Sequence, residues 1–154
     1  VQSGMIAGNK DLIDIIKNYS LFRTYRCSPV TLFELQETVL KYINKKEKEI
    51  PFWSLITVSY SSLEERCKNI AKSISFSSSV EEGESVIGGG TLPGVTLESP
   101  VLLIDDKKPE NIINQLIKND IPVLPRIIKD KVCLDLRSVF QDQDGVIVQA
   151  LNNS

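Results

Sequence analysis

The 154-residue chain contains no histidine. It therefore cannot build a Ser–His or Cys–His nucleophilic pair, and it lacks the commonest ligand of catalytic metal sites. Its three cysteines, Cys27, Cys67 and Cys133, are odd in number and far apart, which argues against a disulfide framework and a zinc cluster. The sequence predicts free, mostly buried thiols in a reducing cytoplasm and no bound metal. Cys27 stays open as a reactive group, because it lies beside arginines and cations favour the thiolate.

The chain also lacks long apolar runs and an excess of positive charge. No stretch approaches the roughly 20 apolar residues that a membrane-spanning helix needs, and no signal-peptide pattern follows Val1. With 18 basic and 20 acidic residues, its net charge is −2. Because nucleic-acid binding relies on clustered lysines and arginines, we expect no direct contact between this chain and a nucleic acid. We likewise expect no membrane association.

Apolar residues at helical spacing predict three helices in the first half of the chain, at residues 9–19, 32–46 and 63–74. Thr31 and Glu34 have the spacing of a capping box, which predicts the start of the second helix. Pro29 disfavours helix for the preceding Ser28, so an irregular segment is expected before that start. Ser61 or Ser62 is the expected cap of the third helix.

The second half of the chain alternates between strand and helix patterns. The Ser- and Glu-rich residues 75–84 indicate either a solvated edge strand or a loose connection. The predicted elements that follow are a strand at 100–105, a helix at 109–118, a hairpin of strands 121–128 and 131–139, and a helix at 142–151. This order predicts an α/β (α+β) fold with a small antiparallel or mixed sheet and helices on one face.

The last predicted strand has one apolar and one polar face. Val132, Leu134 and Leu136 occupy alternate positions, so they are expected to be buried in the core. Asp135 and Arg137 share the other face, where an ion pair between them is expected. The turn that joins this strand to the previous one is expected at residues 129–130.

Residues 85–99, SVIGGGTLPGVTLES, contain three consecutive glycines followed by a Pro-Gly turn. Such a stretch predicts a sharp, crowded bend, because glycine accepts positive φ and close approach. Together with five other segments, it resembles the C-terminal part of the bacterial selenocysteine synthase family, the L-seryl-tRNA(Sec) selenium transferases. The resemblance is carried by residues 2–13, 21–26, 31–40, 65–67, 86–99 and 123–139.

The resemblance implies the C-terminal small domain of a fold-type-I pyridoxal-phosphate (PLP) enzyme, with an N-terminal helical arm. Residues 1–48 would be the end of the large PLP domain and a connecting long helix, and residues 49–154 the small α/β domain. The family's Schiff-base lysine is expected upstream of Val1, so no catalytic residue is expected in the chain, which would be inactive alone. The parent enzyme would be a cytoplasmic homo-oligomer that converts seryl-tRNA(Sec) to selenocysteinyl-tRNA(Sec) with selenophosphate.

Five residues are the expected contributors to the site. The family's Arg-x-x-Arg falls on Arg23 and Arg26, which would bind the anionic selenium donor, since arginine binds oxyanions bidentately; surface charges or carboxylate pairs are the alternative. Arg126 would meet the substrate carboxylate or its ester, with a structural salt bridge as the alternative. Gln2 and Gly4 would lie near the cofactor.

One departure from the family pattern leaves the function open. Ser28-Pro29 stands where the family tends to have an Asp-Lys pair, which favours a related PLP enzyme acting on another amino-acid-like substrate. A domain that serves assembly without catalysis is the third possibility. A PLP lysine upstream of Val1 would argue against the assembly role, and a selenophosphate synthetase in the same genome would favour the selenium transferase.

Overall fold

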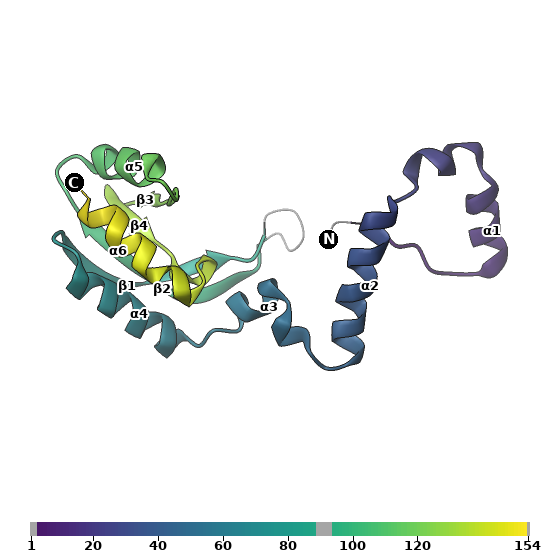
Figure 1. The fold of residues 1–154 in the computed structure, drawn as a ribbon, viewed down its shortest axis with the longest axis horizontal. Helices are drawn as coiled ribbons and strands as arrows, with labels where there is room; N and C mark the ends of the chain where they lie inside the picture. The colour runs from purple at the N-terminus through teal and green to yellow at the C-terminus, as the bar shows by residue number, and fades with distance from the viewer. Residues whose placement is uncertain (1–2, 89–93, 154) are drawn as a thin grey trace. The chain divides into compact units, whose positions relative to one another are not determined.

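The chain divides into two units, Val1–Ile50 and Pro51–Ser154. The computed structural model describes residues 3–88 and 94–153 (Figure 1). Gln2 lies outside the described residues, as do two of the three consecutive glycines, Gly89 and Gly90. The predicted cofactor contact of Gln2 and the predicted glycine bend therefore have no structural account.

The first unit consists of helices joined by short segments. They are α1 (Lys10–Asn18), the 3-10 helix η1 (Ser20–Tyr25), α2 (Pro29–Ile43) and the 3-10 helix η2 (Glu47–Glu49). The side chain of Asn9 caps α1 by accepting a hydrogen bond from the Asp11 amide at 2.8 Å. The predicted first helix is thus confirmed, whereas the segment expected to be irregular contains η1.

The predicted start of the second helix was wrong by three residues. Helix α2 begins at Pro29, and its cap is Ser28, whose hydroxyl accepts from the Thr31 amide at 3.1 Å. Proline suits the first helical position because its missing N–H would have no partner there. Thr31 is therefore inside the first turn rather than at the cap.

Neither α1 nor α2 buries a residue within the described structure. Their apolar side chains face outward: Leu12 is 62% exposed and Leu32 is 55% exposed. Short helices gain most of their stability from packing of an apolar face. These two helices therefore carry apolar faces that the described residues leave uncovered.

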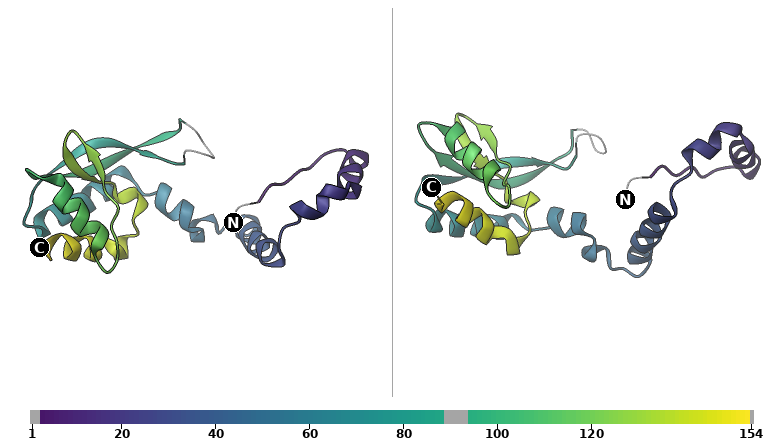
Figure 2. Two further views of the ribbon diagram at one scale, coloured as in Figure 1. Left: turned by 90° about the horizontal axis from the view of Figure 1, so that it is seen from above. Right: turned by 45° about the horizontal axis from the view of Figure 1, so that its top comes forward.

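The second unit contains one antiparallel sheet with the strand order β1-β2-β4-β3 (Figure 2). Its elements include α3 (Pro51–Ile56), α4 (Tyr60–Ser73), α5 (Pro109–Lys118) and α6 (Asp144–Asn152). The strands are β1 (Ser77–Val86), β2 (Thr96–Asp105), β3 (Arg126–Ile128) and β4 (Lys131–Leu134). The small sheet predicted from the element order is present and antiparallel. Of the two possibilities for residues 75–84, the edge strand is the one found, with β1 at residues 77–86. The cap of α4 is Ser59, which corrects the expected Ser61 or Ser62.

Helices α4, α5 and α6 pack their apolar residues against one face of the sheet. Leu63 and Cys67 of α4 meet Leu102 of β2 in a buried cluster, and α5 contributes Ile112 and Leu116. Val132, Leu134 and Leu136 belong to the same cluster and are at most 4% exposed, which confirms their predicted burial. Residues at alternate positions point to the opposite face. There, a smaller buried cluster contains Val101, Leu103 and Cys133.

The predicted hairpin has the expected turn but shorter strands. Lys129 and Asp130 have φ of 51° and 60°, the positive values that a tight two-residue hairpin turn requires. The strand expected at 121–128 is reduced to β3, because Pro122 and Pro125 have no N–H to give to a ladder. The strand expected at 131–139 ends at Leu134.

A 3-10 helix, η3 (Leu136–Ser138), follows β4, and Asp135 forms its cap. The Asp135 carboxylate accepts from the Arg137 amide at 3.1 Å, which turns the backbone out of the extended conformation. A second 3-10 helix, η4 (Gln141–Gln143), precedes α6, so the last helix begins two residues later than predicted.

The buried position of Leu134 gives a stability prediction. Leu134→Ala should lower the free energy of unfolding by about 2–5 kcal/mol, because it removes buried methyl groups and leaves a cavity. Leu124→Ala is the matched control: Leu124 is 79% exposed, and the change should stay within about 0.5 kcal/mol. Urea denaturation followed by circular dichroism measures both. Equal losses in the two variants would contradict the assigned core.

Candidate functional site

Arg23 and Arg26 lie at the end of η1 in the first unit. Arg23 is in its last turn, and Arg26 follows as the capping residue with extended backbone. Both side chains are exposed, and neither forms an ion pair with an acidic residue in the described part of the chain. Both guanidinium groups can therefore reach an external anion. Their convergence on a single anion stays a prediction.

Gly4 precedes α1 in an exposed segment without regular secondary structure. A Cβ built at Gly4 would meet no atom within 4 Å. The described residues around Gly4 thus form no enclosed cradle for a cofactor. Its predicted cofactor contact remains untested.

Arg126, the third predicted arginine, lies on β3 in the second unit and pairs with Asp135. Its Nη2 donates to Asp135 Oδ2 at 3.2 Å and to the carbonyl oxygen of Glu84 at 3.4 Å. The Arg126 side chain is 44% exposed, whereas that of Asp135 is 13% exposed. The ion pair expected between Asp135 and Arg137 is therefore wrong. The hairpin register places Arg126 opposite Cys133, on the face to which Asp135 also belongs.

Asp135 accepts hydrogen bonds from three further donors. Ser85 Oγ of β1 donates to Oδ2 at 2.6 Å, and Ser99 Oγ of β2 donates to Oδ1 at 3.2 Å. The amide of Arg137 also donates to Oδ1. Both serines are buried, so the carboxylate satisfies hydroxyl groups that would otherwise lack a partner. In this polar network, Asp135, which directly follows β4, is bonded to one residue from each of the other three strands. They are Ser85 of β1, Ser99 of β2 and Arg126 of β3.

Arg137 is buried and binds backbone oxygens. Its Nη1 donates to the carbonyls of Ile56 and Val58, both at 3.0 Å, and its Nη2 donates to that of Glu98 at 2.8 Å. Arg137 thus connects the end of α3 and the segment after it to β2. Its function is structural, because its charge is aimed at the chain's own carbonyl groups.

Arg66, buried on α4, forms a two-pronged ion pair with Asp144 of α6. The Nε–Oδ2 distance is 2.9 Å and the Nη2–Oδ1 distance is 2.7 Å. The same Nη2 donates to the carbonyl of Val139 at 2.9 Å. The pair therefore ties α4 to the start of α6, in the planar fork geometry that arginine provides and lysine does not.

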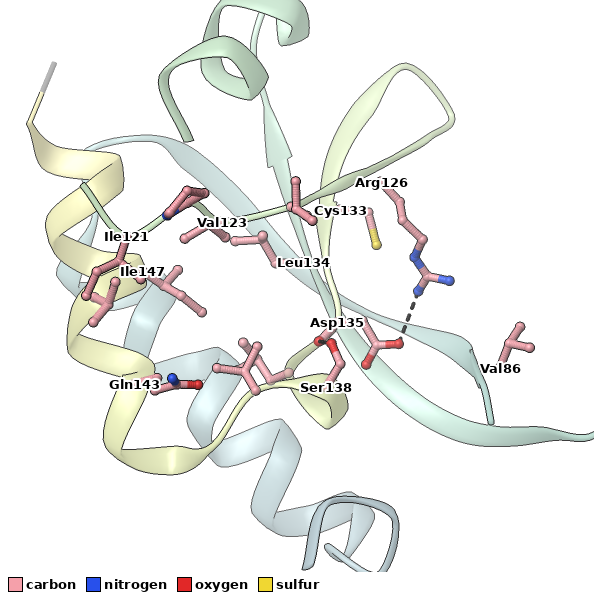
Figure 3. A pocket seen from close by; sticks show the side chains of 15 residues that line it. Val86, Ile121, Val123, Arg126, Cys133, Leu134, Asp135, Ser138, Gln143 and Ile147 are labelled. Atoms are coloured by element: carbon pink, nitrogen blue, oxygen red, sulfur yellow. Dashed lines mark hydrogen bonds and ion pairs between the residues drawn. The ribbon is translucent and has the colours of Figure 1, made fainter. Parts of the chain in front are cut away.

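A hollow of about 550 Å³ lies beside β4 in the second unit. Figure 3 shows Arg126 and Asp135 at one side of it and Ile121, Val123 and Ile147 at the other. Residues 121–124, which precede β3, form part of its wall. A second hollow of about 570 Å³ is acidic, and it is lined by Tyr60, Glu82, Gly83, Glu84 and Glu98.

The cysteines are free, with Cys27 exposed and the other two buried. Burial raises the pKa of Cys67 to about 12. Burial also raises the pKa of Cys133, although the neighbouring Arg126 opposes that rise. The two buried thiols are therefore protonated at neutral pH, as expected for structural cysteines.

Comparison with known proteins gives the family of this chain. The model of the family described as "SelA: L-seryl-tRNA selenium transferase" matches residues 1–140. The chain belongs to this family. The resemblance inferred from the separate sequence segments is confirmed.

Relatives with assigned names agree with the family. Proteins named L-seryl-tRNA(Sec) selenium transferase match from Clostridium perfringens (35% identity over 97% of this chain), Aliarcobacter butzleri (32% over 99%) and Clostridium botulinum (31% over 96%). The chain spans 34% of the length of each of these relatives.

The sequence singles out the three arginines of this chain but gives little indication of the central position of Asp135. Ser85 and Ser99 flank the glycine-rich motif and gave no signal of a shared partner, since they lie 50 and 36 residues from Asp135. The only local signal was a polar residue between the apolar Leu134 and Leu136.

Within residues 3–88 and 94–153, no group of His, Cys, Asp and Glu could hold a metal, and no helix is long and apolar enough to cross a membrane.

The ion pair of Arg66 and Asp144 gives a second stability prediction. Arg66→Met should lower the free energy of unfolding by about 3–5 kcal/mol, because it leaves a partly buried carboxylate without its partner. Lys68→Met is the matched control on the same helix: Lys68 pairs with Glu64 at 2.9 Å but is exposed, so its loss should cost less than about 1 kcal/mol. Chemical denaturation of both variants checks the difference. Similar losses would contradict a structural role for the buried pair.

Thiol accessibility gives a third prediction. Ellman's reagent at mildly alkaline pH should modify Cys27 quickly, while Cys67 and Cys133 should react only after denaturation, because burial keeps both as inaccessible thiols. A Cys27→Ser variant should lose the fast phase alone. Rapid labelling of Cys67 or Cys133 in the folded chain would contradict the described core.

Proposed function

We propose that this chain is the C-terminal part of a PLP-dependent transferase that converts seryl-tRNA(Sec) to selenocysteinyl-tRNA(Sec) with selenophosphate. Membership of the L-seryl-tRNA selenium transferase family supports this function. The names of the relatives point to the same aminoacyl-tRNA substrate. The transferase would work in the cytoplasm as a homo-oligomer.

The division of the chain suits this proposal. The first unit, Val1–Ile50, would be the end of the large PLP domain with its connecting helix, and the second unit, Pro51–Ser154, the small domain. The apolar faces of α1 and α2 need a packing partner, because neither helix buries a residue in the described structure. The remaining two thirds of a protein of the relatives' length would supply one.

The observation that carries the proposal is the pair of exposed arginines at the family's Arg-x-x-Arg. Arg23 and Arg26 present guanidinium groups that no acidic residue of the described structure neutralises. Selenophosphate carries anionic oxygens, and the planar fork of arginine binds such oxygens through paired N–H groups. We assign these two residues to binding and orienting the donor anion.

PLP, when bound, supplies an electron sink for the transfer. The open space around Gly4 does not form a binding cradle, so we derive no chemical step through the cofactor from this chain's residues. Gln2 and Gly4 stay predicted neighbours of PLP. Arg126 likewise stays a predicted contact of the substrate carboxyl group or ester, with Asp135 holding one end of its guanidinium group.

The departure at Ser28-Pro29 supports the alternative of a related PLP enzyme with another amino-acid-like substrate. In the structure, these residues form the cap and the first position of α2. They therefore start a helix where the family tends to place two charged side chains. A titration with selenophosphate distinguishes the two functions, because the alternative enzyme would not use selenophosphate.

The test uses a full-length transferase that ends in this sequence. Arg23→Ala and Arg26→Ala should each weaken the apparent affinity for selenophosphate by about 10- to 100-fold at saturating seryl-tRNA(Sec), the loss expected for a hydrogen bond to a charged group. Arg26→Lys should also reduce turnover, because lysine keeps the charge but loses the fork.

Lys17→Ala is the control, since it removes an exposed cation of the same unit without touching the Arg-x-x-Arg pair. It should leave donor affinity unchanged, and the PLP absorbance should be the same in all variants. Unchanged donor affinity in both arginine-to-alanine variants would refute the assignment of the pair.

A further inference from the structure

The hollow beside β4 has an apolar wall and one polar end. Ile121 and Val123 come from the segment between α5 and β3, Leu134 comes from β4, and Ile147 comes from α6. Among the described residues that line it, only Arg126 and Asp135 are charged. Pockets that bind small molecules commonly combine such apolar walls with a few fixed polar groups.

The polar end offers hydrogen-bond donors rather than acceptors. Each oxygen of Asp135 already accepts two hydrogen bonds. Oδ2 accepts from Ser85 and Arg126, and Oδ1 accepts from Ser99 and the Arg137 amide. Arg126 uses Nη2 for its two bonds to oxygen within the described structure, and its guanidinium group also hydrogen-bonds the Cys133 side chain. Because the group carries five N–H donors, it keeps capacity for a ligand oxygen. The Asp135 carboxylate already has four hydrogen bonds and is poorly placed to bind a cationic ligand group, whereas Arg126 can still donate to an anionic oxygen.

Two hydrogen bonds hold the guanidinium group of Arg126 without a ligand. Its bonds to Asp135 and to the Glu84 carbonyl hold one end of the guanidinium group against β1. Asp135 is held in turn by the buried hydroxyls of Ser85 and Ser99. A preorganised charged group loses less conformational freedom on binding than a mobile one.

We propose that this hollow binds a small amphiphile with an apolar body and an anionic oxygen head, either a carboxylate or a phosphate. The body lies against Ile121, Val123 and Ile147, and the head meets Arg126. This ligand goes beyond the proposed transferase function, since neither seryl-tRNA(Sec) nor selenophosphate combines these two parts in one small molecule. Its head would occupy the same Arg126 that is the predicted contact of the substrate carboxyl group or ester, so the two ligands would exclude each other there.

The experiment titrates the full 154-residue chain with octanoate, octyl phosphate, octylamine and inorganic phosphate, followed by methyl and guanidinium NMR. Octanoate or octyl phosphate should shift Ile121, Val123, Ile147 and Arg126 with saturation, and comparison of the two identifies the preferred head. Octylamine and inorganic phosphate should each bind at least about tenfold more weakly, which corresponds to about 1.4 kcal/mol.

Two variants with matched exposure separate binding from folding. Ile121→Asp adds a negative charge inside the hollow and should weaken octanoate or octyl phosphate by about tenfold or more. Ile127→Asp makes the same change on β3, outside the lining, where the side chain is 53% exposed against 56% for Ile121. It should leave the affinity unchanged.

Equal weakening by Ile121→Asp and Ile127→Asp would overturn the proposal. So would octylamine binding as tightly as octanoate, inorganic phosphate binding as tightly as octyl phosphate, or the absence of saturable shifts in the millimolar range. None of these outcomes bears on donor binding by Arg23 and Arg26, so the two proposals fail separately.

Discussion

The carboxylate of Asp135 is the interaction on which the sheet face opposite α4, α5 and α6 depends. It accepts hydrogen bonds from the hydroxyls of Ser85 on β1 and Ser99 on β2. It also accepts hydrogen bonds from the guanidinium group of Arg126 on β3 and from the backbone amide of Arg137 in η3. A buried hydroxyl without an acceptor costs free energy, and Ser99 is fully buried. One residue thus joins strands from distant parts of the sequence, ends β4 and orients Arg126 beside the hollow.

Two buried arginines perform the corresponding task on the helical side. Arg66 connects α4 to α6 through Asp144, and Arg137 connects β2 to the end of α3 through backbone carbonyls. Both side chains bring buried guanidinium groups to the edge of an apolar core, where they hydrogen-bond specific oxygens. The apolar cluster supplies the burial, while these contacts determine which element lies beside which.

The two units distribute function differently. The first exposes the Arg-x-x-Arg pair on a segment with little packing of its own, as suits a part that completes a larger site. The second has its own core and its own hollow, formed because two prolines keep residues 121–125 out of the sheet. In the proposed transferase, the first unit would contribute donor binding, and the second a domain with its own core and the proposed ligand hollow.

The sequence by itself determined the helix at 109–118, the hairpin turn and the burial of Val132, Leu134 and Leu136, because these follow from local periodicity and turn chemistry. The family came from the resemblance of separate sequence segments, and residues 75–84 fitted an edge strand and a loose connection alike. The sequence misplaced the start of α2, where Ser28 and Pro29 prevail over the Thr31 pattern, and it overextended the strands around the hairpin. Only the tertiary structure decided that Asp135 pairs with Arg126 rather than Arg137. That choice depends on strand register and on the turn of the backbone after β4, which bring together residues that no local pattern connects.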